Sequence, residues 1–183
     1  MSFLNPQRSS RGACRLAALV LAAAVFGLTG RAAAADASML EYKVKAGYLF
    51  NFAKVIEWPA KALPMPNSPF IIGVLDGGEA LPTFQSLLAG KTVNGRPVQV
   101  QAVSADRVAS GVHILFVTRA SGKSPEEVAA ALGGAATLLV GEAEGFAQRG
   151  GSINFIQVDG NVKFEANPDA ADRAQLKLGS QLL

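Results

Sequence analysis

Short apolar runs that alternate with helical patterns constrain the fold of this chain more than any other feature of the sequence. Runs of this length, bounded by turn residues, are typical of buried strands. Four segments are predicted to be strands: Phe70–Leu75 and residues 98–103, 112–118 and 137–140. Helices are predicted between and after them: residues 79–89, residues 105–109 and Pro125–Leu132. Alternation of this kind favours a sheet whose strands run parallel, because the intervening helices act as crossovers.

The C-terminal part has the pattern of a β-hairpin followed by a helix. Residues 152–158 and Asn161–Ala166 are two predicted strands that flank an Asp-Gly dipeptide, which favours a tight two-residue turn. Asn167 is a suitable cap for a last helix that ends before Gly179. The sequence therefore predicts an α/β fold. It has a mostly parallel sheet flanked by helices on both faces, with an antiparallel C-terminal hairpin.

A longer helix is predicted ahead of these strands. Ser38 and Glu41 match a capping box, in which each side chain bonds an otherwise unpaired backbone donor. Glu41 and Lys45 form an i,i+4 pair on the polar face. The helix is expected to end at Trp58, because the proline that follows disfavours helical geometry there. The apolar face is predicted to comprise Leu40, Val44, Ala46, Tyr48, Leu49, Phe50, Phe52, Ala53 and Val55.

The first 35 residues have the features of a cleavable secretory signal. Arginines precede an apolar run over residues 16–28, and the small residues 33–35 provide a cleavage site. A transmembrane helix is the alternative, but it needs about 20 apolar residues. The prediction is a signal peptide over residues 1–35 and one domain over residues 36–183, exported to the periplasm and soluble after cleavage.

Removing this leader changes the charge and the thiol content. Four of the 17 basic residues lie in the leader, so 13 remain against 14 acidic residues. The apparent basicity of the whole chain therefore gives no support for nucleic-acid binding. Cys14 is the only cysteine, so the mature domain is predicted to lack disulfides.

Residues that could support catalysis are few. His113 is the only histidine and lies within an apolar run, where a satisfied strand residue is favoured over a general base. A zinc site, a cysteine nucleophile or a Ser-His-Asp arrangement finds little support in this composition. Gly122-Lys123-Ser124 lacks the earlier glycine that a phosphate-binding loop requires. No enzyme activity, cofactor or metal is predicted.

One geometric argument points to a ligand site. Ligands of open parallel sheets bind outside the carboxyl ends of the strands. The residues expected to gather at that edge are Asp76, Gly77, Thr118, Arg119, Gly141 and Glu142. A small polar ligand is the expected occupant. Tight turning alone also explains the glycines after the first strand.

Two segments resemble the YfiR family of periplasmic regulators. The first is residues 42–59, which end in Glu-Trp-Pro, and the second is residues 139–156, with the pattern Gly-Phe, Gly-Gly and Ile-Asn-Phe. Residues 161–167 and the last ten residues extend the resemblance, which covers essentially the mature chain. The resemblance implies a non-enzymatic protein that restrains an inner-membrane diguanylate cyclase, or a sensor kinase, by binding its periplasmic domain. It also implies a possible homodimer and an outer-membrane lipoprotein as a second partner. Relatives can carry disulfides, and this chain departs from them there.

The residues expected to contact the partner are polar positions in these segments and one aromatic residue. They are Lys54, Glu57, Phe146, Lys163, Glu165 and Arg173. On the hairpin, Lys163 and Glu165 should share one face, because side chains alternate along a strand. A solvated face is the alternative for these charges. The aromatic residues assigned to the core are Phe50, Phe52, Phe155 and Phe164. The rival function is a periplasmic small-molecule-binding sensor.

Overall fold

The computed structural model describes residues 37–182, apart from residue 66, residues 105–107 and residues 109–110. The predicted leader and the predicted helix over residues 105–109 fall wholly or largely outside these residues. The chain divides into two units, Met1–Ser38 and Met39–Leu183, and the fold described below belongs to the second. Within the described residues, no helix has the length and apolar character that a membrane span requires.

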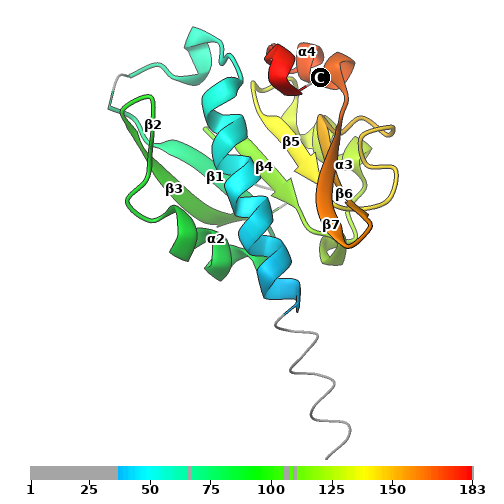
Figure 1. Cartoon of the computed structure of the whole chain (residues 1–183). Helices are drawn as coiled ribbons and strands as arrows, with labels where there is room; N and C mark the ends of the chain where they lie inside the picture. Colours follow the sequence, from blue (N-terminus) through cyan, green and yellow to red (C-terminus); the bar gives the residue numbers. More distant parts are fainter. Residues whose placement is uncertain (1–36, 66, 105–107, 109–110, 183) are drawn as a thin grey trace, which may run out of the picture. The chain divides into compact units, whose positions relative to one another are not determined.

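The second unit is built on a seven-stranded sheet in the described residues, with the strand order β2-β3-β1-β4-β5-β6-β7 (Figure 1). Its central strands are parallel, as the sequence predicts. The bounds are β1 Phe70–Leu75, β2 Thr92–Val93, β3 Arg96–Val103, β4 Ile114–Val117, β5 Leu138–Gly141, β6 Ile153–Val158 and β7 Asn161–Ala166. The antiparallel β6–β7 hairpin is confirmed at one edge.

A second antiparallel pair closes the other edge, where β2 pairs with β3. This pair differs from the predicted fold, which has no strand there, although Asn94 and Gly95 form one of the strongest short hairpin signals. Both residues have positive φ, at 51° and 80°, as a tight hairpin turn of this type requires. The first strand of this hairpin has only two residues, which is too short to show alternation in the sequence.

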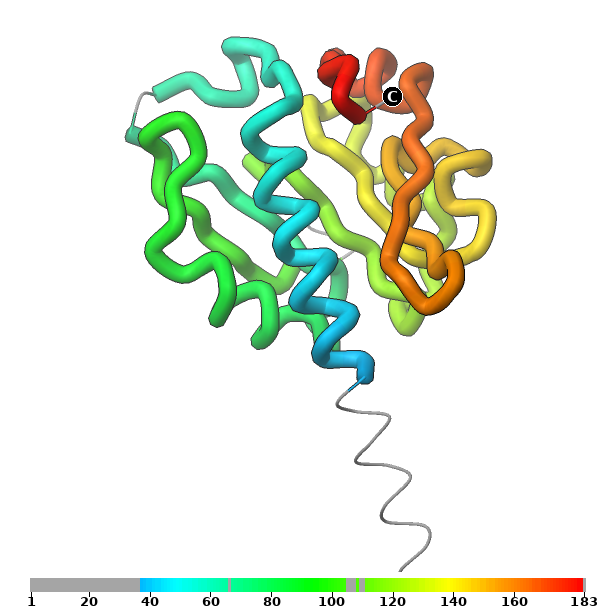
Figure 2. Tube along the Cα trace, viewed as in Figure 1, coloured from blue at the N-terminus to red at the C-terminus, as the bar shows by residue number. Residues whose placement is uncertain are grey.

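The opening helix covers residues 37–55, and its residues in the second unit, 39–55, lie across one face of the sheet (Figure 1). Ser38 lies inside the helix, so the predicted capping box at its start is wrong. The helix also ends before Trp58, because Glu57 leaves it to pair with Lys177 in an antiparallel bridge. Figure 2 shows the C-terminal segment beside this end of the helix. The proline therefore does not decide where the helix ends.

The same face of the sheet is covered by α2, which spans Ala80–Leu88, and by the C-terminal segment. The last helix, α4, spans only Pro168–Arg173 and is capped by Asn167 as predicted. It is shorter than expected, because Lys177 is recruited into the bridge with Glu57. The core under this face includes Leu49, Phe52, Phe70, Phe84, Phe116, Phe155 and Leu176.

The opposite face is covered by α3, which spans Pro125–Leu132 and begins with a complete Ser124–Glu127 capping box. A smaller core there surrounds Phe146, which is fully buried. A Cβ atom added at Gly141 or at Gly151 would collide with the Phe146 ring. Packing therefore requires two parts of the Gly-Phe and Gly-Gly pattern, the Phe146 ring and Gly151 against it.

Candidate functional site

Glu142 lies at the carboxyl end of β5 and is buried, with 7% of its surface exposed. Its Oε1 atom accepts a hydrogen bond from the backbone N–H of Arg119, at 2.9 Å, just after β4. The Arg119 guanidinium donates in turn to the Glu142 carbonyl oxygen, also at 2.9 Å. The ends of two neighbouring parallel strands thus hold one carboxylate in a fixed orientation.

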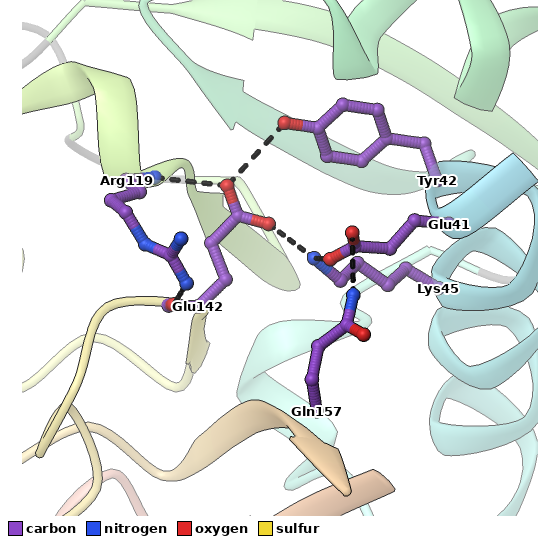
Figure 3. A network of polar contacts seen from close by, with 6 residues as sticks. All are labelled: Glu41, Tyr42, Lys45, Arg119, Glu142 and Gln157. Atoms are coloured by element: carbon purple, nitrogen blue, oxygen red, sulfur yellow. Dashed lines mark hydrogen bonds and ion pairs between the residues drawn. The ribbon is translucent and has the colours of Figure 1, made fainter. Parts of the chain in front are cut away.

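Lys45 provides the counter-charge from the opening helix. Its Nζ atom lies 2.5 Å from Oε2 of Glu142 and also forms an ion pair with Glu41 (Figure 3). Only 2% of Lys45 is exposed. The predicted Glu41–Lys45 pair therefore forms, but the lysine points into the protein, contrary to its predicted place on a polar face. The sequence pattern does not predict the burial of Lys45, because a lysine is assigned to the polar face of a helix by its residue type.

Tyr42 and Gln157 complete this group. The Tyr42 hydroxyl donates to Oε1 of Glu142 at 3.4 Å, and Gln157 donates to Oε2 of Glu41 at 2.7 Å (Figure 3). We call Glu41, Tyr42, Lys45, Arg119, Glu142 and Gln157 the Glu142 cluster. It joins the opening helix, the ends of β4 and β5, and the β6 strand.

The electrostatics of the Glu142 cluster favour a protonated tyrosine. Burial raises the pKa of Tyr42 above its ordinary value, and the charge of Glu142 and the hydrogen bond to it raise it further. Lys45 also lies 5.2 Å from the centre of the Tyr42 ring and 5.8 Å from that of Phe155. Both Glu142 oxygens are occupied by protein donors, so the arrangement positions elements of the fold and leaves this carboxylate without a free oxygen.

The predicted ligand edge is thus partly assembled. Arg119 and Glu142 are in direct contact, and Thr118 and Gly141 are the residues next to them in the chain. Asp76 and Gly77 form the turn after β1, where both have positive φ, at 55° and 72°. Asp76 bonds through its backbone to Val103 on the far side of β1. Ligand binding by these six residues stays a prediction.

His113 lies at the opposite, amino end of β4 and is 4% exposed. The Ile71 N–H donates to its Nδ1 atom at 3.0 Å, so the ring proton is on Nε2, which donates to the Ala62 carbonyl at 2.9 Å. Burial lowers the pKa of His113, and the positive charge of Arg96 acts in the same direction. Both ring nitrogens are used within the fold, as expected for a satisfied residue rather than a general base.

The predicted partner-contact residues lie on separate elements. Lys163 and Glu165 share the face of β7 opposite to Val162 and Phe164, which pack on the core. The other charged positions are Arg173 on α4, Lys54 near the end of the opening helix, and Glu57 just after it.

Phe146 differs from the other predicted contact residues, because its ring lies wholly in the core. It therefore offers no exposed surface, and any effect on a partner would act through the loop it supports. Phe52 and Phe155 are buried as predicted, and Phe50 and Phe164 are partly buried against the same core.

Comparison with known proteins gives one informative result. No curated protein matches the chain, whereas the family described as YfiR/HmsC-like matches residues 42–183. The two segments that resemble this family, residues 42–59 and 139–156, meet at the Lys45–Glu142 ion pair. Among the described residues, no three His, Cys, Asp or Glu side chains are grouped as metal ligands would be. The match spans nearly all of the described fold, and the chain belongs to the YfiR/HmsC-like family.

Proposed function

We propose that this protein is a periplasmic regulator that binds and restrains an inner-membrane signalling protein, a diguanylate cyclase in particular. The observation that carries the proposal is the family match over residues 42–183, which supports a periplasmic regulatory role in general. The predicted secretory leader supports the same location. Binding the periplasmic domain of the cyclase would lower the output of cyclic-di-GMP inside the cell.

The chemistry of the buried polar groups is consistent with a binding protein. His113 uses both ring nitrogens on backbone partners, and Glu142 is neutralised by Lys45. A regulator of this kind acts by binding one state of its receptor more tightly than the other. A tenfold shift of the receptor equilibrium needs about 1.4 kcal/mol of differential binding, which a few interface contacts supply.

The β7 face is a first candidate for part of this interface. Lys163 is exposed, and Glu165 is partly exposed and accepts a hydrogen bond from Gln148 at 3.1 Å. The two charges stand side by side on one face of an edge strand, where another protein has access. Exchanging their signs changes the pattern of charge and preserves the net charge.

A genetic experiment tests the proposed function. Deleting the gene should raise cyclic-di-GMP and biofilm formation, and the unchanged gene supplied in trans should restore both. Lys163→Glu combined with Glu165→Lys should restore them only in part if the β7 face contacts the cyclase. Lys123→Glu, at an exposed loop position, serves as the control and should restore them fully. Unchanged cyclic-di-GMP after deletion would contradict regulation of a cyclase.

Small-molecule sensing is a second proposal, supported by two hollows at the amino ends of the strands, the edge opposite to the one predicted from the sequence. Their volumes are about 260 and 380 Å³, and both are lined by Ala135 and Thr137. The larger one also borders His113 and Lys61. Thermal shifts against a panel of metabolites test it: a melting temperature raised by one compound, and not in a variant with Ala135→Phe, supports a ligand there. A flat response throughout contradicts it.

A further inference from the structure

The outer face of the opening helix exposes three apolar side chains, two of which the sequence pattern assigns to the core. Met39, Leu40 and Val44 are 49%, 63% and 42% exposed. The inner face of the helix already fills its part of the core with other residues, Ala46, Leu49, Phe52 and Ala53. The predicted apolar face is therefore wrong at Leu40 and Val44. These side chains form a second apolar surface on the other side of the helix.

The same outer face is positively charged. Lys43 lies three residues after Leu40 and therefore beside it, and Lys54 lies on the same side of the helix eleven residues, or about three turns, after Lys43. Lys54 and Lys91 both approach the Phe50 ring, at 4.0 and 5.3 Å from its centre. Among the described residues, none of these three exposed lysines has a carboxylate within ion-pair distance. The one acid in the described part of this helix, Glu41, is engaged by Lys45 and Gln157.

Gly47 lies in the middle of this face. A Cβ atom there would meet nothing within 4 Å, so the fold itself would accept alanine. Glycine inside a helix is less stable than alanine, because it loses more backbone freedom on folding. The helix therefore carries a destabilising residue that packing does not require. What a glycine provides at this place is an open stretch of backbone that another chain can approach closely.

From these observations we propose that the outer face of the helix over residues 39–54 docks an acidic amphipathic helix of the partner protein. The apolar side of that helix packs on Leu40 and Val44, its backbone passes close to Gly47, and its carboxylates reach Lys43 and Lys54. Two helices would then pack against each other through apolar side chains, with charge complementarity at the rim. The inference rests on the proposed function, since the partner is the periplasmic part of the restrained cyclase.

The charge and the narrow apolar stripe of the outer face favour an acidic protein segment over two other binding partners, a second copy of the chain and a lipid surface. A second copy of the chain would bring the same lysines against each other, and like charges oppose such a pairing. A lipid surface would need a broad apolar face, as interfacial helices have, but here the broad apolar face is buried against the sheet. An acidic protein segment satisfies both the lysines and the narrow apolar stripe.

The test is binding of the purified mature chain to the purified periplasmic region of an inner-membrane diguanylate cyclase from the same organism. Lys43→Glu combined with Lys54→Glu should weaken binding about tenfold or more. Gly47→Leu should weaken it similarly, because the new side chain blocks close approach. Raising the salt concentration should weaken binding by the unchanged chain, since the contacts are exposed charges.

Controls keep the test independent of folding. Lys123→Glu, compared with Lys43→Glu alone, makes the same charge change at an exposed position elsewhere and should leave the affinity within about twofold. Gly47→Ala should raise the melting temperature while it does not strengthen binding. Circular dichroism should show an unchanged fold for every variant, since all these positions are exposed.

The outcomes separate this inference from the proposed function. If the unchanged chain binds and both helix variants bind equally well, the docking surface lies elsewhere and the inference is wrong, while the proposed function stands. Absence of binding by the unchanged chain contradicts both. A homodimer, or sedimentation with phosphatidylglycerol vesicles, that the lysine variant abolishes would also overturn the inference, in favour of a second copy or of lipid.

Discussion

The two ends of the β4 and β5 strands bury polar side chains in opposite ways. At the carboxyl end, Glu142 is held by the ammonium of Lys45 and by donors from Tyr42 and Arg119. At the amino end, His113 is held as a neutral ring by two backbone groups. One end thus depends on a charge pair between distant segments, and the other on hydrogen bonds without net charge.

The two ends should therefore respond differently to solution conditions and to mutation. Removing one member of a buried ion pair leaves the other charge without compensation, which costs far more than the pair contributes as a whole. Removing a neutral ring leaves two unsatisfied backbone groups, a smaller loss. The carboxyl end should therefore be the more sensitive to substitution, and the amino end should dominate the response to acid near neutral pH.

Lys45→Met tests the sensitivity of the carboxyl end. It leaves Glu142 buried without its ammonium, and the expected loss in the free energy of unfolding is about 3–5 kcal/mol. Chemical denaturation with urea measures it. Combining Lys45→Met with Glu142→Gln should recover part of this loss, because the uncompensated charge is then removed.

Lys43→Met provides the matched control in the same helix. Lys43 is exposed, so its removal should change the stability by no more than about 0.5 kcal/mol. If Lys45→Met were as well tolerated as Lys43→Met, the two ends of the strands would not differ as proposed.

His113→Gln tests the amino end. Loss of the ring contacts and of at least one hydrogen bond should lower the free energy of unfolding by about 1–3 kcal/mol at pH 7.5. Because the folded-state pKa of His113 lies below its ordinary value of 6.5, the unfolded chain binds more protons. Stability contributed by the neutral ring is therefore present above pH 6.5 and is lost as the pH falls below it.

The pH profile of this variant separates the ring from other acid-sensitive groups. Between pH 7.5 and pH 5, the unchanged chain should lose stability more steeply than the His113→Gln variant, measured by urea denaturation at each pH. Equal slopes would show that His113 does not titrate on unfolding in this range.

The sequence predicted the fold well where local and tertiary preferences agree. The β6–β7 hairpin and the Asn167 cap are local features, and both form as predicted. The two helix ends that were wrong, after residue 55 and after Arg173, depend on the Glu57–Lys177 bridge. That bridge joins residues far apart in the chain, so periodicity could not reveal it.

The candidate site was predictable only in part for the same reason. The carboxyl-edge rule brings Arg119 and Glu142 together correctly, because it follows from parallel strands. It says nothing of Lys45 and Tyr42, which reach this edge from a helix packed across the sheet. The exposure of Leu40 and Val44 was missed because an apolar face was counted on both sides of the helix. Only the packed structure shows which side faces the core.

Tyr42→Phe should have the smallest effect on stability at the carboxyl end, because it removes one long hydrogen bond and leaves the Lys45–Glu142 pair intact. The expected loss in the free energy of unfolding at pH 7.5 is about 0.5–1 kcal/mol. The matched control is Tyr48→Phe, which removes a hydrogen bond of the same length to the Val162 carbonyl.

Alkaline pH isolates the electrostatic part of the Tyr42 contribution. The folded-state pKa of Tyr42 lies above its ordinary value of 10.0, so its contribution to stability is complete below pH 10 and is lost as the pH rises further. The unchanged chain should therefore lose more stability than Tyr42→Phe between pH 9 and pH 11. Equal losses would mean that the hydroxyl is not held against the Glu142 carboxylate, and that the charge pair of the carboxyl end acts without it.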